Sequence, residues 1–157
     1  ELALKEVASQ VERRIEQNIP PNLQLRPERF MACISTNYET AKRIIRKTAR
    51  IAAYYNSKWY ILYVQTPRET DEKIKLSLQR HLINNFKLAT ELGAEVIKVK
   101  SNSVAKAIAE AAIEHKITTI CIGKPHISLF NIILNTAVFN QLLSKLSETD
   151  IDIIILS

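Results

Sequence analysis

The chain has 157 residues, of which 46% are hydrophobic and 24% are charged. This length suits one domain with a proper hydrophobic core, and the composition excludes an intrinsically disordered chain. The formal net charge of +6 favours an anionic partner such as nucleic acid, anionic lipid or an acidic protein, although solvated helix faces explain the same excess. The sequence shows neither a signal peptide nor an apolar run near the roughly 18 residues that span a membrane.

The first 27 residues predict a helix and a linker that precede the domain. An amphipathic helix over residues 1–18 is indicated by four apolar residues at helical spacing, Leu4, Val7, Val11 and Ile15. Pro20 and Pro21 end this helix, and residues 22–27 form a stiff linker. Because the chain starts without methionine and in a helical pattern, we expect it to be a piece of a longer protein.

Five apolar runs over residues 28–157 predict buried strands, namely Phe30–Ser35, Trp59–Val64, Ala94–Val99, Ile117–Ile122 and Ile151–Leu156. Helical patterns separate these runs, the second from about Glu69 to Leu92 and the last from about Thr136 to Leu146. Alternating strands and helices with right-handed crossovers predict an α/β fold with a mostly parallel, doubly wound sheet. We expect the strand order 3-2-1-4-5.

The two glycines, Gly93 and Gly123, limit the chemistry of the chain. A Walker loop, a dinucleotide fingerprint and a G-x-S-x-G elbow each need glycines close together, so all three are excluded. The histidines His81, His115 and His126 show no metal-ligand spacing, and we predict neither a metal site nor catalytic residues. Two cysteines in apolar strands, Cys33 and Cys121, predict buried free thiols.

A ligand crevice is predicted where the first and fourth strands end. In the expected strand order, Ser35, Thr36 and Asn37 face the turn at Gly123, Lys124 and His126, and such a switch point is where open α/β sheets bind ligands. Lys124 and the N-terminus of the following helix favour an anion. Alternatively, residues 35–37 only cap the next helix.

A second candidate surface is the outer side of the helix that follows the first strand. It carries the densest basic stripe in the chain, Lys42, Arg43, Arg46, Lys47 and Arg50. No aromatic residues interleave with the stripe as they do in single-strand binders, so we predict no nucleic-acid binding. An acidic protein is the expected partner. The apolar connection Ile127–Leu134 is a further candidate contact surface.

The chain resembles the universal stress protein domain of the KdpD osmosensitive sensor kinases over about residues 28–157. The residues that carry the resemblance are Ala32–Ser35, Ala49–Ala53, Trp59–Val64 with Thr66-Pro67, Ala89–Glu95 and Ile122–Pro125. The helix over 1–18 is similar to the segment that follows the ATPase-like region of those kinases.

The resemblance implies two possible ligands, ATP and cyclic di-AMP. ATP-binding members carry G-x-x-G, nine residues and then G-[S/T]. Here Gly123 matches the first glycine, but His126 stands in place of the second and Thr136-Ala137 in place of the last pair, which argues against ATP. For cyclic di-AMP, the matching residues are Cys33, Ser35 and Tyr63, while Asn37 and Glu39 depart from the pattern.

The resemblance implies a non-catalytic, cytoplasmic regulatory domain of a potassium- and osmotic-stress sensor kinase that works in two-component signalling. We expect protein contacts with other domains of the parent kinase, with an acidic universal stress protein or with a second copy of the chain. The alternative is a small-molecule sensor that binds a nucleotide in the crevice.

Overall fold

The central sheet of the domain is the one predicted from the sequence. The computed structural model describes residues 27–70, 72–124 and 132–157, and for residues 132–136 only the backbone. Five parallel strands form one sheet in the order β3-β2-β1-β4-β5. They are β1 (Phe30–Ile34), β2 (Trp59–Gln65), β3 (Glu95–Lys100), β4 (Thr119–Gly123) and β5 (Asp152–Leu156). The expected fold class and strand order are confirmed.

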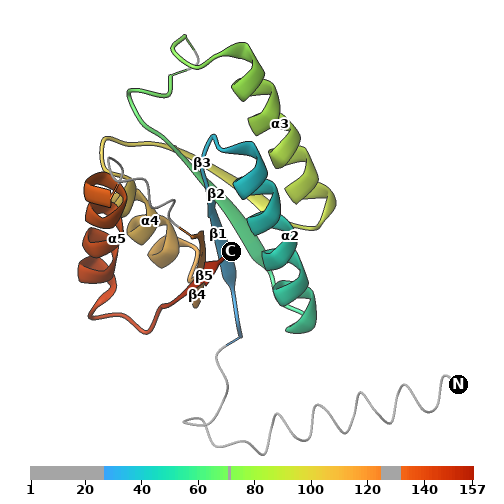
Figure 1. Ribbon diagram of the computed structural model, residues 1–157. Coiled ribbons are helices and arrows are strands. Elements are labelled where there is room, and N and C mark those ends of the chain that lie inside the picture. Colours follow the sequence, from blue (N-terminus) through green and yellow to red (C-terminus); the bar gives the residue numbers. More distant parts are fainter. Residues whose placement is uncertain (1–26, 71, 125–131) are drawn as a thin grey trace, which may run out of the picture.

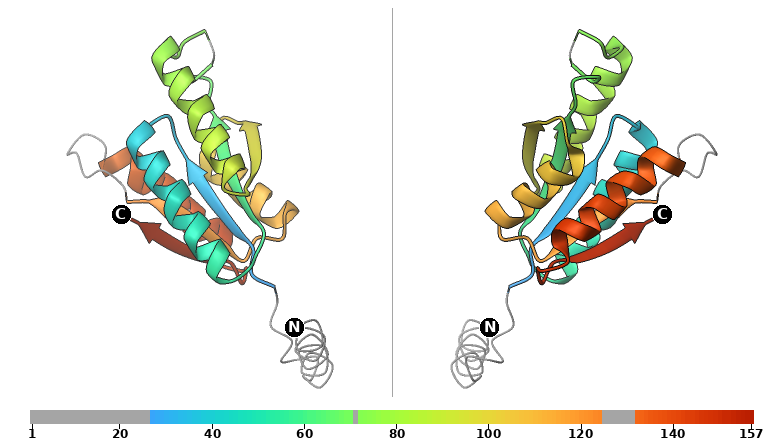
Figure 2. Two further views of the ribbon diagram at one scale, coloured as in Figure 1. Left: turned by 90° about the vertical axis from the view of Figure 1, so that its right-hand side faces the viewer. Right: turned by 90° about the vertical axis from the view of Figure 1, so that its left-hand side faces the viewer.

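Four helices cover the two faces of the sheet. They are α2 (Tyr38–Tyr54), α3 (Leu76–Glu91), α4 (Val104–Glu114) and α5 (Ile132–Leu146). The helices α2 and α3 lie on one face, and α4 and α5 lie on the other (Figure 1). Figure 2 shows each pair in front of the sheet in turn. Within the described part of the chain, no helix has the length and apolar character needed to cross a bilayer.

Two hydrophobic cores result from this arrangement, and β1 contributes to both. Phe30, Ala32 and Ile34 pack with α2 and α3, whereas Met31 packs with α4 and α5 on the opposite side. Successive strand residues point to opposite faces of a sheet, so a strand that is apolar throughout is covered on both sides. The run of apolar residues that predicted β1 is continuous because helices cover both faces of the sheet at this strand.

The helix α2 presents one apolar and one basic side. Its buried residues follow helical spacing and are Ala41, Ile44, Ile45, Thr48 and Ala52. The Asn37 side chain accepts a hydrogen bond from the Thr40 amide at 3.1 Å and so caps the helix. Tyr55, which helical spacing placed on the inner side, is instead 55% exposed, because α2 ends at Tyr54.

Two helix boundaries differ from the prediction. The helix expected from about Glu69 begins at Leu76. In the described residues before it, the Glu69 amide bonds to the Thr66 carbonyl, and the Lys73 and Ile74 amides bond to the Thr70 carbonyl, as in turns. The helix expected from about Thr136 begins at Ile132, so part of the apolar connection is helical. Gly93 has φ 90 after the end of α3, as a glycine at a helix C-terminus does.

Candidate functional site

A small cavity lies at the carboxyl ends of β1 and β2, on the side covered by α4. It has a volume of about 280 Å³. Its apolar wall comes from β1, β2 and α4, and its rim carries polar side chains; the lining residues are Cys33, Ile34, Ser35, Leu62, Val64, Thr66, Arg68, Glu69, Val104 and Ile108. The crevice predicted from the sequence lay between the ends of the first and fourth strands. This cavity shares Ser35 with that prediction, but its lining residues include none from β4.

The carboxylate of Glu69 ties together the loops that follow β1 and β2. The Thr36 hydroxyl donates to Glu69 Oε1 at 3.2 Å, and the Thr66 hydroxyl donates to Glu69 Oε2 at 3.5 Å. A carboxylate at this mouth opposes a bound phosphate by charge repulsion. Sequence reasoning missed Glu69 because it assigned the residue to a helix. The turn signal Thr66-Pro67 directly before it could have indicated a loop.

The other polar residues after β1 bond locally. The Ser35 hydroxyl accepts a hydrogen bond from the Asn37 amide at 3.3 Å, and the Asn37 side chain caps α2. Both side chains are exposed. The structure thus brings Ser35, Thr36 and Asn37 to the expected edge of the sheet and uses each in a turn, a cap or a loop contact.

Gly123 ends β4 against the helix α2. A Cβ atom at this position would lie 2.8 Å from Ile44 Cδ1 and 2.9 Å from Thr40 Cγ2, which is closer than carbon atoms pack. The glycine therefore allows close packing between strand and helix. The next residue, Lys124, donates its amide to the Leu156 carbonyl at 2.9 Å and continues the pairing with β5, and its side chain is exposed.

The remaining predicted ligand residues are not gathered at this crevice. The Tyr63 side chain is 1% exposed and packs in the core beneath α2 and α3, with its ring 6.0 Å from that of Phe86. His126 and residues 127–131 of the apolar connection Ile127–Leu134 lie outside the described residues, and Thr136 is described only as part of the α5 backbone.

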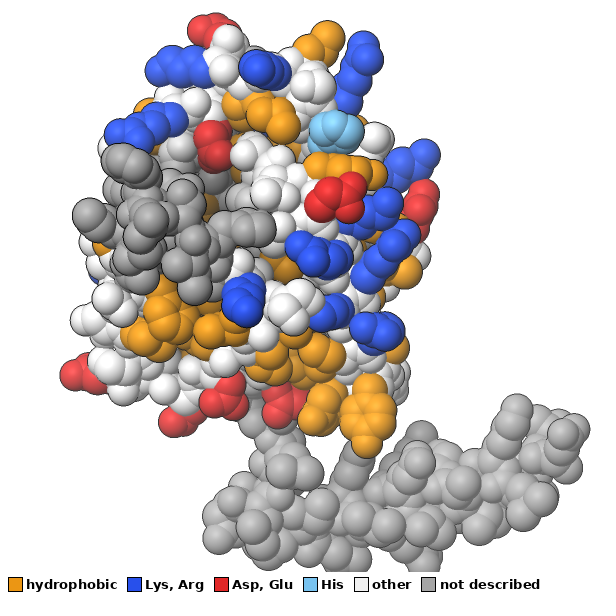
Figure 3. Space-filling view, viewed as in Figure 1, with side chains coloured by type: hydrophobic (Ala, Val, Ile, Leu, Met, Phe, Trp, Pro, Cys, Tyr) orange, Lys and Arg blue, Asp and Glu red, His pale blue; other side chains and the backbone are white. Residues whose placement is uncertain are grey.

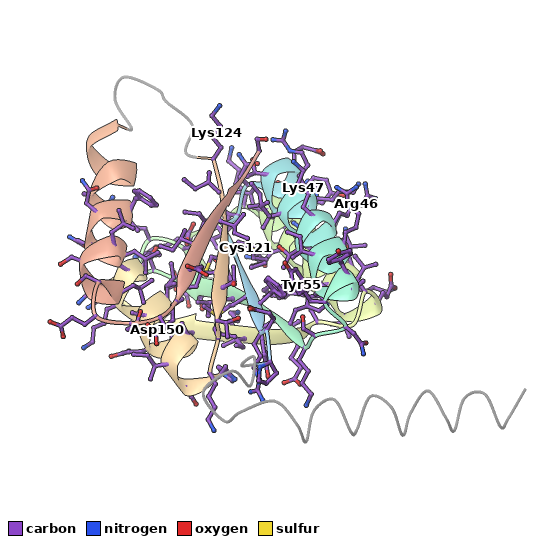
Figure 4. All side chains as sticks on the ribbon, turned by 90° about the horizontal axis from the view of Figure 1, so that it is seen from below. Arg46, Lys47, Tyr55, Cys121, Lys124 and Asp150 are labelled. Carbon is purple, nitrogen blue, oxygen red and sulfur yellow. The ribbon has the colours of Figure 1, made fainter. Side chains whose placement is uncertain are left out.

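The two cysteines are free thiols, as predicted. Cys121 is fully buried and lies within the sheet (Figure 4), and Cys33 is half-buried. Burial raises the pKa of both thiols because it disfavours the thiolate, and a charge on Cys121 would raise the pKa of Cys33 further. The nearby Thr48 hydroxyl partly opposes the rise in the pKa of Cys121. Both thiols are therefore protonated and unreactive near neutral pH.

A polar hollow of about 720 Å³ lies beyond the ends of β2 and β3. Its walls include Thr66, Lys73, Lys100, Ser101 and Asn102. Sequence reasoning missed this hollow, which depends on the turns that replace the first part of the expected long helix. Among the described residues, no group of three or more histidine, cysteine or acidic side chains could hold a metal ion.

The basic stripe lies on the outer side of α2. Figure 3 shows basic side chains gathered over this helix, with hydrophobic side chains at the lower border. Figure 4 shows Arg46 pointing away from the sheet. A groove of about 660 Å³ is lined by Arg43, Arg46, Lys47, Ala49, Arg50, Ala53 and Leu92. The stripe and the end of α3 therefore form one hollowed surface.

The five basic residues of the stripe differ in their contacts. Lys42 Nζ lies 5.4 Å from the centre of the Tyr38 ring, and Lys47 Nζ donates to the backbone carbonyl of Ser157. The guanidinium groups of Arg43, Arg46 and Arg50 make no hydrogen bond or ion pair with any residue that the structure describes. Among the described residues, the one ion pair joins Lys106 and Glu110 on α4.

No known family model matches the chain, but individual proteins do. It is 36% identical over 130 residues to the sensor protein KdpD of Clostridium acetobutylicum, and 31% identical over 96 residues to that of Escherichia coli. These alignments cover 80% and 61% of the chain. A KdpD-type sensor protein of Synechocystis is 29% identical over 98% of the chain.

Solved structures agree with the sequence matches. A universal stress protein in complex with cAMP superimposes with a TM-score of 0.60 at 18% identity, covering 84% of this chain and 98% of that one. A universal stress protein from Archaeoglobus fulgidus in complex with dAMP gives a TM-score of 0.57 at 17% identity, with 83% and 98% covered. The chain has the universal stress protein fold and is similar in sequence to a segment of the KdpD sensor proteins. It spans 40%, 14% and 10% of the lengths of the three KdpD proteins.

Proposed function

We propose that this universal-stress-protein domain is a non-catalytic regulatory module of a potassium- and osmotic-stress sensor kinase, and that it acts in the cytoplasm through protein contacts. Its docking surface is the basic stripe of α2. The observation that carries the proposal is the set of three arginines on that stripe, Arg43, Arg46 and Arg50, which have no hydrogen-bond or ion-pair partner among the described residues. The similarity to KdpD sensor proteins supports a place in two-component signalling.

The stripe lowers the stability of its own helix, which supports a role outside the fold. Basic residues three and four apart lie beside one another on a helix, as Arg43 does with Arg46 and Arg46 with Arg50. Each such like-charge pair destabilises a helix by about 0.2–0.5 kcal/mol. An acidic surface would relieve this repulsion on docking. Candidate partners are other domains of the parent kinase, an acidic universal stress protein and a second copy of the chain.

Charge reversal tests this proposal. We expect the variant Arg43→Glu, Arg46→Glu, Arg50→Glu to lose binding of a purified acidic universal stress protein at a salt concentration of about 50 mM, where screening is weak. The control reverses Lys106, Lys116 and Lys145, which makes the same change in net charge on the α4 and α5 side. Equal loss in both variants shows that only net charge matters, and unchanged affinity in the first variant contradicts the proposal.

A nucleotide sensor is the second candidate function, and the cavity at the ends of β1 and β2 favours it. The apolar wall formed by residues such as Leu62, Val104 and Ile108 suits one face of a purine base, and the Ser35 hydroxyl stands at the rim. The solved structures with cAMP and dAMP point to the same class of ligand. The carboxylate of Glu69 and the packed Gly123 weigh against a di- or triphosphate.

Thermal-shift and calorimetric titrations with cAMP, AMP, ATP and cyclic di-AMP test the second candidate. We expect a nucleoside monophosphate or cyclic nucleotide to raise the melting temperature more than ATP does, because fewer negative charges face Glu69. The variant Val104→Phe fills the cavity from its edge and should abolish the shift. A shift that persists in this variant excludes the cavity as the binding site.

A further inference from the structure

Three arginines of α2 that have no hydrogen-bond or ion-pair partner among the described residues border a groove with an apolar floor. We use the term arginine groove for the hollow lined by Arg43, Arg46, Lys47 and Arg50, with an apolar floor of Ala49, Ala53 and Leu92. Leu92, at the end of α3, is 43% exposed, and the Ala53 side chain is exposed. A surface that only attracted opposite charge would need no such floor, because long-range attraction does not depend on apolar contact.

Both lysines of the stripe contact other groups of the domain, whereas the arginines have no hydrogen-bond or ion-pair partner in the part of the chain that the structure describes. Lys42 lies over the Tyr38 ring and Lys47 bonds to the Ser157 carbonyl. The groups left for a partner are therefore planar guanidinium groups, which pair with carboxylates through two parallel hydrogen bonds. Beside an apolar floor these bonds are strengthened, since water is partly excluded.

The spacing of the arginines fits a helical partner. Arg43 and Arg50 are seven residues apart, which corresponds to about 10 Å along a helix, and Arg46 lies between them on the same side. On a partner helix, acidic residues spaced three and four apart lie at the same distances from one another as the three arginines do. Ala49 and Ala53 form an i, i+4 row whose small side chains let a second helix approach closely.

We propose that the arginine groove is the docking site for an acidic amphipathic helix of a protein partner. Carboxylates of that helix pair with the three guanidinium groups, while an apolar side chain of leucine size covers Ala49, Ala53 and Leu92. The inference rests on the proposed function and narrows it. It requires an apolar residue on the acidic partner, and it requires arginine rather than lysine on this domain, because the planar guanidinium group pairs with a carboxylate through two hydrogen bonds.

Two synthetic peptides with equal negative charge test the inference. The first is a capped helical peptide with glutamates at three- and four-residue steps and leucines on the adjoining face, and the second has glutamine at every leucine position. We expect the leucine peptide to bind the full chain about tenfold more tightly, as burial of part of one leucine side chain implies. Fluorescence anisotropy at about 50 and 300 mM salt measures both affinities.

Two kinds of variant separate the groove from simple charge attraction. The variant Arg43→Lys, Arg46→Lys, Arg50→Lys keeps the charge and should weaken the leucine peptide about tenfold, because lysine cannot form the bidentate pair. Ala53→Gln covers the exposed floor without a change in charge and should remove the preference for leucine. The matched control Arg80→Lys makes the same chemical change at an exposed residue of α3 outside the groove and should change neither affinity.

The outcomes distinguish failure of the inference from failure of the proposed function. If both peptides bind alike and the arginine-to-lysine variant binds as well as the wild type, the groove has no role, while docking by charge stands. If neither peptide binds, the inference fails, and the proposed function depends on the result with the acidic universal stress protein. If only phosphatidylserine vesicles bind, and not phosphatidylcholine vesicles or peptides, the surface recognises lipid and the inference is overturned.

Discussion

The crevice at the carboxyl ends of the strands and the outer side of α2 are both rich in polar groups, but the two regions use them differently. In the crevice, Ser35, Thr36 and Asn37 bond to neighbouring loops or to a helix end. On α2, three arginines have no such bonds among the described residues. Polar groups that are already satisfied contribute to the fold, and those that are not remain open to a partner.

This difference changes how the glycine of the crevice is understood. Gly123 occupies the place where universal stress proteins that bind ATP, as the sequence resemblance implies, carry the first glycine of their phosphate loop. In this chain the same residue lets β4 pack against Thr40 and Ile44 of α2. Close packing against α2 therefore explains a glycine at this position, and the glycine is no argument for a phosphate.

Substitution of Gly123 should give the largest loss of stability. We expect Gly123→Ala to destabilise the domain by about 1–3 kcal/mol, as overpacked core sites do, and Gly123→Val to cost more. Urea denaturation measures the loss. The double change Thr40→Ser, Ile44→Val removes the two contact atoms. Gly123→Ala should therefore cost much less stability when it is made in this double variant than when it is made in the wild type. A loss for Gly123→Ala below about 0.5 kcal/mol contradicts the packing role.

The pH dependence of stability should show that the strands beside the crevice bury neutral thiols. The folded-state pKa values of Cys33 and Cys121 are raised, so their contribution is complete below the unfolded pKa of about 8.5 and is lost as pH rises above it. Between pH 7 and about 9.5 the unfolding free energy should fall, because the thiols ionise in the unfolded chain while burial keeps them protonated in the folded one. The variant Cys33→Ala, Cys121→Ala should lose less stability over this range than the wild type. An equal loss in the variant and the wild type would show that the thiols ionise as freely in the folded state as in the unfolded state.

Helix caps provide a smaller test of the comparison. Asn37 caps α2 at the crevice and Ser103 caps α4 on the opposite side of the sheet. If Asn37 serves the fold, Asn37→Ala should lower the unfolding free energy by about 1 kcal/mol, as the loss of a helix cap does, and Ser103→Ala should have an effect of similar size. A negligible effect at Asn37 together with a clear effect at Ser103 would indicate that the crevice residue is not needed for stability.

The sequence predicted the strands and their order because β-branched apolar runs and right-handed crossovers leave few alternatives. It also predicted the basic stripe from helical spacing. It could not predict which cations are free, since Lys47 meets Ser157, which lies 110 residues away in the chain. The role of Gly123 likewise depends on contacts with a helix about 80 residues earlier. Spacing in the sequence shows which side of a helix is basic, and only tertiary contacts show which of its charges are already in use.

The smallest predicted effect has the opposite sign and concerns Arg46. This residue has a like-charged neighbour four residues away on each side, Lys42 and Arg50. Arg46→Glu turns both repulsive pairs into attractive ones and should raise the unfolding free energy by about 0.5–1 kcal/mol at low salt. Arg46→Gln, which only removes the repulsion, should give about half of this gain, and both gains should shrink at about 1 M salt. A loss of stability in Arg46→Gln would mean that the arginine is held by the fold after all, and the contrast between α2 and the crevice would then fail.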